Sequence, residues 1–282
     1  MTQSLESITP PDCHARALVL AGEVELIRLE MGRPADPRPP LAVSGASPRE
    51  VWFQALAVFR KADRLCHELT GDPTAAVPHA PPISEIRPGH VLAVIDATLR
   101  EVVTIKQSLG IVELPAAVTR DPQKQPSDVL ATLSTVNRQI NLLLERPFTP
   151  ADVFQQVSFA VAYAARLGRT AAPAEPALER RKRPADVYAR LLACLELTRT
   201  LVTRAGHPVI DRLGAPEPDT IRPADVYDLA SLVLGEIAFL HALAPDPNPP
   251  YPFEGNTPGR KLPAHCFQLV GVLEQQLRQL AG

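Results

Sequence analysis

Three pairs of neighbouring histidine and cysteine are the residues of this sequence best suited to metal or redox chemistry: Cys13-His14, Cys66-His67 and His265-Cys266. Thiolate sulfur and imidazole nitrogen are ligands that zinc and copper prefer. Cys13 and Cys266 occupy the same place in a repeated pattern. If the two helix starts meet, Cys13, His14, His265 and Cys266 form a candidate metal site. Adjacent residues of a helix do not share a face, however, and both cysteines also fit as small buried residues in place of valine.

Catalytic patterns are sparse. Asp63, Cys66 and His67 lie on neighbouring turns of one expected helix and allow a Cys–His–Asp nucleophile; the other interpretation is a solvated helix end. Residues 255–261 superficially resemble a phosphate loop, but they have the wrong spacing and contain a proline. The sequence shows no H-E-x-x-H and no G-x-S-x-G. We therefore expect a protein without catalysis more than an enzyme, and the sequence identifies no cofactor.

Aromatic residues recur near the start of several expected helices: Trp52, Phe154, Tyr188, Tyr227 and Phe267. Three of them, Trp52, Tyr188 and Tyr227, are candidates for binding a ligand or a partner. The same residues also suit a hydrophobic core, with the tyrosine hydroxyls at its rim.

A repeated stretch predicts the elements that position these residues. Arg183-Pro-Ala-Asp-Val-Tyr188 recurs at 222–227 and, as Thr-Pro-Ala-Asp-Val-Phe, at 149–154. Proline suits the first turn of a helix, and a carboxylate two residues later suits the positive end of the helix dipole. Looser copies complete a set of eight predicted helices: 10–31, 48–70, 88–109, 126–145, 150–167, 184–205, 223–243 and 263–281.

The helix starts also predict an internal duplication. The prolines at 10, 48, 88 and 126 recur at 150, 184, 223 and 263, which are offsets of about 140, 136, 135 and 137 residues. We expect an all-α fold of eight long helices in two duplicated four-helix units, residues 1–146 and 147–282. Long proline-rich linkers could run back along each helix, so parallel and alternating helices both remain open.

Composition narrows the function classes. The chain of 282 residues is 45% hydrophobic, has a net charge of −2 and contains four cysteines without a C-x-x-C. We expect no nucleic-acid binding, and we interpret the basic run 180–183 as a solvated linker. We also expect no membrane span, no signal peptide and a cytoplasmic location. The leading hypothesis is a helical scaffold or sensor-type module that binds a protein partner or self-associates. The alternative is a small-molecule- or metal-binding bundle that uses the Cys/His or tyrosine positions.

Overall fold

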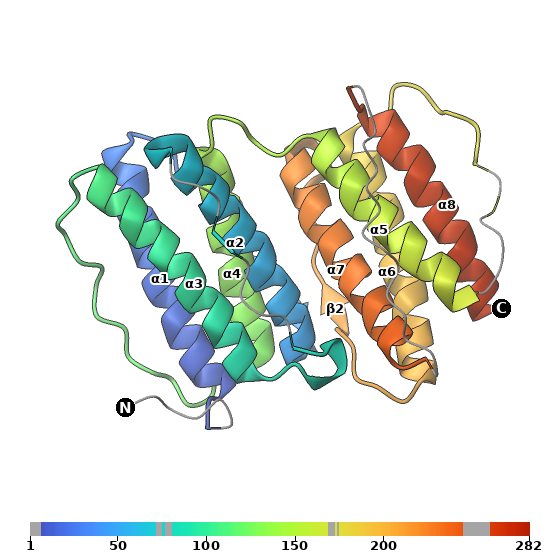
Figure 1. Cartoon of the computed structure of the whole chain (residues 1–282), viewed down its shortest axis with the longest axis horizontal. Helices are drawn as coiled ribbons and strands as arrows, with labels where there is room; N and C mark the ends of the chain where they lie inside the picture. The colour runs from blue at the N-terminus through green and yellow to red at the C-terminus, as the bar shows by residue number, and fades with distance from the viewer. Residues whose placement is uncertain (1–6, 72–74, 77–80, 169–172, 174, 245–259) are drawn as a thin grey trace. The chain divides into compact units, whose positions relative to one another are not determined.

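The computed structural model describes residues 7–71, 75–76, 81–168, 173, 175–244 and 260–282, and these form an all-α protein. The described residues form eight long helices, which are labelled in Figure 1 where there is room. They are α1 (Pro10–Glu30), α2 (Pro48–Thr70), α3 (Pro88–Ser108), α4 (Pro126–Leu143), α5 (Pro150–Gly168), α6 (Pro184–Arg204), α7 (Pro223–Ala242) and α8 (Pro263–Ala281). All eight begin at the predicted proline, and each ends within two residues of its predicted end. The all-α fold class is therefore confirmed.

Each helix start is held by the same hydrogen bond, which explains the repeated sequence. The residue before the first proline donates its backbone N–H to the side chain three positions later. In α1, the amide of Thr9 donates to Asp12 Oδ2 at 2.9 Å, and in α6 the amide of Arg183 donates to Asp186 Oδ2 at 2.6 Å. In α3 and α8 a histidine takes the place of the carboxylate, and Nδ1 of His90 or His265 accepts at 3.0 Å. This bond is one arm of a capping box.

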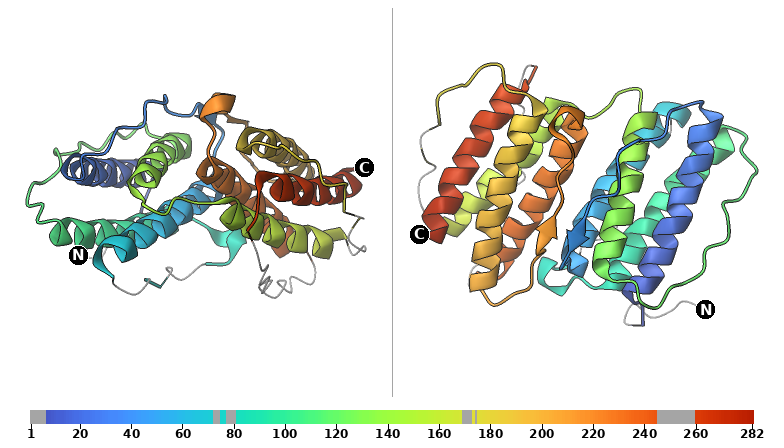
Figure 2. Two further views of the ribbon diagram at one scale, coloured as in Figure 1. Left: turned by 90° about the horizontal axis from the view of Figure 1, so that it is seen from above. Right: turned by 180° about the vertical axis from the view of Figure 1, so that it is seen from behind.

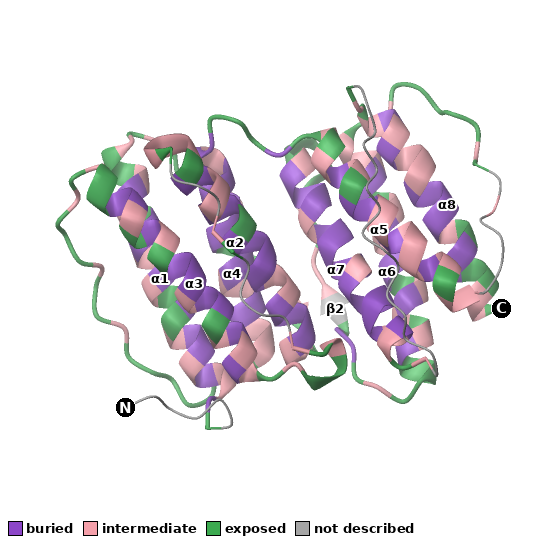
Figure 3. Cartoon of the chain, viewed as in Figure 1, coloured by how far each residue is buried: buried purple, intermediate pink, exposed green. Residues whose placement is uncertain are grey.

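The chain divides into two compact units. Unit 1 consists of Met1–Pro147 with Ile210–Ala215, and unit 2 consists of Phe148–Val209 with Pro216–Gly282. In unit 1, α1 and α2 each pack against both α3 and α4; in unit 2, α5 and α6 each pack against both α7 and α8. Figure 2 shows the helices of each unit side by side from two further directions. Within each unit the buried residues line the inner helix faces (Figure 3).

All four helices of each unit run parallel. Their first turns surround one small apolar cavity in unit 1, lined by Pro10, Cys13, Pro48, Val51, Pro88, Val91, Pro126 and Val129. The equivalent cavity of unit 2 is lined by Pro150, Val153, Pro184, Val187, Pro223, Val226, Pro263 and Cys266. Four helix starts can meet in this way only if the helices share one direction. The sequence left this orientation open, and a linker that returns along the helices, as residues 31–47 do, makes it possible.

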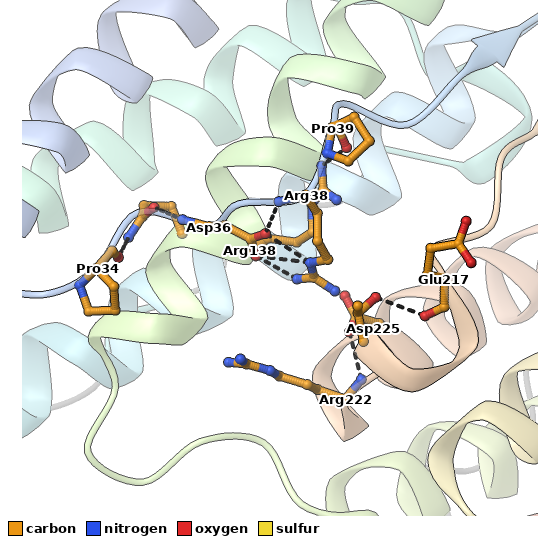
Figure 4. A network of polar contacts seen from close by, with 10 residues as sticks. Pro34, Asp36, Arg38, Pro39, Arg138, Glu217, Arg222 and Asp225 are labelled. Atoms are coloured by element: carbon orange, nitrogen blue, oxygen red, sulfur yellow. Dashed lines mark hydrogen bonds and ion pairs between the residues drawn. The ribbon is translucent and has the colours of Figure 1, made fainter.

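The linker between α1 and α2 shows how such a return is held. Its backbone is bonded along α4 in reverse order: Asp36 N–H donates to Gln139 Oε1 at 3.0 Å, Arg138 Nη2 donates to the Pro39 carbonyl at 2.9 Å, and Ala46 N–H donates to Ser127 Oγ at 3.0 Å. Figure 4 shows Arg138 and Pro39 beside the ion pair that joins Asp36 to Arg38. The linker is therefore part of the packed unit.

Two short strands, which the sequence analysis did not predict, extend unit 1. Strand β1 (Val43–Ser44) pairs antiparallel with β2 (Arg212–Leu213), which lies in the linker between α6 and α7. Glu50, at the capping position of α2, accepts the amide of Ser47 with one oxygen and the amide of Ile210 with the other, both at 2.7 Å. A segment from the second half of the sequence is thus part of unit 1, which a single boundary at residue 146 does not include.

Candidate functional site

The two candidate thiols at helix starts are buried structural groups. Cys13 and Cys266 are 2% and 1% exposed, and each takes the place of a valine in the ring of first-turn residues. Cys13 Sγ donates to the Pro88 carbonyl at 3.2 Å, and Cys266 Sγ donates to the Pro150 carbonyl at 3.1 Å. Burial raises the pKa of both thiols to about 12. At neutral pH they are protonated, which makes them poor nucleophiles and poor metal ligands.

The structure does not bring the four predicted metal ligands together as one described group. Cys13 and His14 belong to unit 1, whereas His265 and Cys266 belong to unit 2. Burial lowers the pKa of the His14 imidazole, and His265 uses Nδ1 to hold the start of α8. Among the described residues, no three side chains of His, Cys, Asp or Glu are grouped to hold a metal ion. The metal hypothesis therefore gains no geometric support here.

The three aromatic candidates lie in buried positions. Trp52, Tyr188 and Tyr227 are 4–6% exposed. Trp52 packs edge-on against Phe53, with ring centroids 5.0 Å apart. The Tyr227 hydroxyl accepts a hydrogen bond from Gln156 Nε2 at 2.9 Å. These contacts match the alternative interpretation, in which the aromatic residues build the core.

The remaining candidate residues are engaged locally. Asp63 Oδ1 accepts the amide of Ala75 at 2.6 Å. In the basic run, Lys182 pairs with Glu179 at 2.7 Å, and its ammonium lies 4.0 Å from the ring centroid of Phe267. Of the loop 255–261, residues 255–259 lie outside the described part of the structure. Neither described group shows an arrangement for chemistry.

The feature that emerges from the structure is the first part of the linker between α3 and α4. We call residues 111–120 the strap. Gly110, with φ +72°, ends α3, and the amide of Ile111 donates to the Lys106 carbonyl at 3.0 Å. This left-handed turn is a common helix ending, and it directs the chain back along the bundle. In Figure 1 the strap is an open trace beside α1 and α3.

Three contacts fix the strap to the helices. Lys106 Nζ donates to the Glu113 carbonyl and to Glu23 Oε2, both at 2.6 Å, so a buried ion pair joins α3, α1 and the strap. Pro115 packs against Gly22, where a β-carbon would come within 2.7 Å of Pro115 Cβ. At the far end, Arg120 Nε donates to Asp12 Oδ1 at 2.6 Å. The strap is therefore positioned rather than loosely attached.

The strap is open and extended, because residues 111–120 contain no helix, turn or bend. Its contacts with α1 run from Gly22, beside Pro115, to Asp12, beside the Arg120 side chain. These two positions are ten helical residues apart, a distance of about 15 Å at 1.5 Å per residue.

A groove lies between the strap, α1 and α3. Its volume is about 290 Å³, and it is lined by Asp12, Ala15, Arg16, Val19, Leu92, Asp96 and Val118. The floor is apolar, whereas the charged side chains at the edge are paired: Arg16 with Asp96, and Asp12 with Arg120, both at 2.6 Å. The hydrogen bond from Arg120 is the largest cause that lowers the pKa of Asp12 to about 2.

The outer side of the strap carries the most exposed large apolar residues among those described. Val112 is 86% exposed and Leu114 is 82% exposed. In the sequence, the run Ile111-Val112-Glu113-Leu114-Pro115 belongs to one of the long linkers that could run back along a helix. The signal available in the sequence is the arrangement of apolar residues around Glu113, which lacks helical spacing and ends at Pro115.

No known protein family, curated protein or solved structure matches this chain. None of the described helices combines the length and the apolarity needed to cross a membrane. The function is therefore argued from the geometry of the strap and the groove.

Proposed function

We propose that this chain is a non-catalytic helical module that binds a protein partner through the strap of unit 1. The observation that carries the proposal is the exposure of Val112 and Leu114 on a backbone fixed by Lys106, Pro115 and Arg120. Removing apolar surface from water contributes about 25 cal/mol per Å², and the costs of association are subtracted from that gain. A surface fixed before binding also avoids much of the entropy cost of ordering a loop.

The state of the cysteines supports this choice over a thiol enzyme or a thiolate metal site. All four cysteines are buried free thiols, and burial raises the pKa of Cys13, Cys194 and Cys266 to about 12. Free thiols also suit a reducing compartment, so we retain the cytoplasm as the proposed location.

A small-molecule-binding module is the second candidate, and the groove beside α1 and α3 favours it. The ligand would rest on Val19 and Leu92, not on the cysteine, histidine or tyrosine positions. A fragment screen followed by methyl NMR tests this function. Binders that shift the methyl signals of Val19 and Leu92 would support it, whereas hits that leave both signals unchanged would exclude the groove.

We also infer that the two units arose by duplication. The order of helix neighbours is the same in both units. The buried pair Glu23–Lys106 between α1 and α3 has its counterpart in Tyr163–His241 between α5 and α7, at offsets of 140 and 135 residues. At the same offsets, the ion pair Arg16–Asp96 corresponds to the hydrogen bond from Gln156 to Ser231.

Site-specific photo-cross-linking tests the proposed partner function. Leu114 is replaced by benzoyl-phenylalanine, and exposed Gln279 of α8 carries the same group as the control. We expect a defined protein adduct, identified by mass spectrometry, at position 114 and not at 279. Excess unmodified chain should compete for it. Equal labelling at both positions, or none at 114, would contradict the function.

A further inference from the structure

Resting on the proposed partner function, we infer that the strap binds its partner by strand addition. An extended peptide segment of the partner pairs antiparallel with residues 112–116, and it presents a basic residue opposite Glu113. Three observations carry this assignment: the direction of the strap's backbone groups, the absence of acceptors for its outer amides, and the charge of Glu113.

The first observation is the alternation of backbone groups along an extended chain. Successive residues of a strand direct their N–H and C=O groups to opposite edges. The Glu113 carbonyl accepts Lys106 Nζ and therefore points toward the helices. Residues 113 and 115 then face inward, and residues 112, 114 and 116 face outward. The one proline of this segment, Pro115, falls at an inward position, so no outward N–H is lost.

The second observation is that the outward edge is unpaired. In the part of the chain that the structure describes, the amides of Val112, Leu114 and Ala116 have no hydrogen-bond acceptor. An exposed strand edge is a template for pairing with another chain. The linker between α1 and α2 in the same unit already pairs in this manner, through β1 and β2.

The third observation selects the occupant. The Glu113 carboxylate is exposed and has no ion-pair partner among the described residues. Opposite charges directly across two strands stabilise the pair, so a lysine or arginine between apolar residues fits best. A second folded copy fits less well, because a five-residue edge buries on the order of a few hundred Å², and stable dimers bury about 1,200 Å² or more.

Two synthetic peptides test the inference on the full chain. The first is acetyl-Ser-Ser-Val-Lys-Val-amide, whose lysine lies opposite Glu113 when the peptide pairs antiparallel with residues 112–116, and the second has glutamate in place of that lysine. We expect the lysine peptide to bind about fivefold more tightly, the ratio that one cross-strand ion pair provides. Glu113→Lys should reverse the preference. Amide exchange measured by NMR should slow at Val112 and Leu114 and stay unchanged at Glu113.

A matched pair of proline variants tests the edge itself. Ala116 and Ala117 are both exposed, but only Ala116 faces outward by the alternation above. Ala116→Pro should weaken binding of the lysine peptide several-fold, and Ala117→Pro should leave it unchanged. The inference is overturned if neither peptide binds, if Glu113→Lys leaves the preference unaltered, or if the chain dimerises through the strap. Loss of the inference leaves the cross-linking result at position 114 as an independent test of partner binding.

Discussion

At the residue scale, the side chain three positions after each helix's capping residue has the same task in all eight helices. A carboxylate accepts the capping amide in six of them, and a histidine accepts it in α3 and α8. Parallel packing brings four positive helix ends together within each unit, so the carboxylates also offset dipole repulsion. A neutral histidine accepts the hydrogen bond but brings no compensating charge.

Replacing the histidine in α8 with the common carboxylate should therefore stabilise the protein. We expect His265→Asp to raise the free energy of unfolding by about 0.5–1 kcal/mol at pH 7, because it keeps the acceptor and adds charge at the helix start. Urea denaturation measures the change. Gln275→Asp, in the second half of the same helix, is the control and should not stabilise. An unchanged or lower stability of H265D would argue against the dipole explanation.

The loss of folding stability at low pH should depend on Asp12. Its pKa is lowered from 3.8 to about 2, mainly by the hydrogen bond from Arg120. A lowered folded-state pKa means that the stabilisation is present above pH 3.8 and is lost as pH falls toward 2. Asp12→Asn should cost up to about 1 kcal/mol at neutral pH, because both side chains of the pair are partly exposed. The difference from the unsubstituted chain should be mostly lost at pH 2 and should vanish below it. A constant difference across that range, measured by denaturation at each pH, would contradict this origin.

The helix starts were predictable because their signals are local. Proline, the acceptor three residues after the cap and the following apolar pair lie within six residues, as in Pro184–Tyr188. The cysteine positions were predictable in the same way, since Cys13 and Cys266 occupy the valine position of the pattern. Whether distant helices meet was not predictable, and the structure places those two thiols in separate units.

At the element scale, the position of the strap depends on long-range contacts that the spacing of residues in the sequence does not reveal. Lys106 and Glu23 are 83 residues apart, and Gly22 meets Pro115 across a comparable separation. Gly22 is a helical glycine without a turn to explain it, and close approach of the strap supplies the reason. The candidate site could not be derived from the sequence. Its exposed apolar residues are of the same types as core residues, and only the position of the strap in the fold leaves them exposed.

A substitution at Gly22 should displace the strap. A β-carbon there would lie 2.7 Å from Pro115 Cβ, so Gly22→Ala forces one of the two elements to move. Alanine alone should improve the helix by up to about 1 kcal/mol, and we expect the displaced strap to offset that gain. NMR shifts of amides 113–117 measure the displacement. Adding Pro115→Gly should restore the gain in α1, and additive effects of the two substitutions would contradict direct contact.

At the scale of the whole molecule, sequence order and spatial units do not coincide. Residues 210–215 lie within unit 1 although they follow α6, and they are joined to it by β1 and by Glu50. Six helices have a carboxylate that accepts the capping amide, and Glu50 is the one glutamate among these six. Its longer side chain reaches both the Ser47 and the Ile210 amide. The regular proline spacing predicts a clean boundary between two halves, and a pairing of Val43 with Leu213, 170 positions away, lies outside any local pattern.

A fragment that ends at residue 147 should therefore be an incomplete unit. We expect residues 1–147 to unfold at lower urea concentration than the same helices in the full chain, because β1 loses its partner and Glu50 keeps a buried carboxylate oxygen without the Ile210 amide. A peptide of residues 207–216, added in trans, should raise the midpoint in a concentration-dependent manner.

Glu50→Asp in the fragment retains the cap but shortens the side chain, and it should weaken the peptide's effect several-fold. Asp186→Glu in the full chain is the matched control and should change stability little, because Asp186 accepts the Arg183 amide and no second amide among the described residues. If the peptide leaves the fragment's midpoint unchanged, Ile210–Ala215 is not a structural part of unit 1.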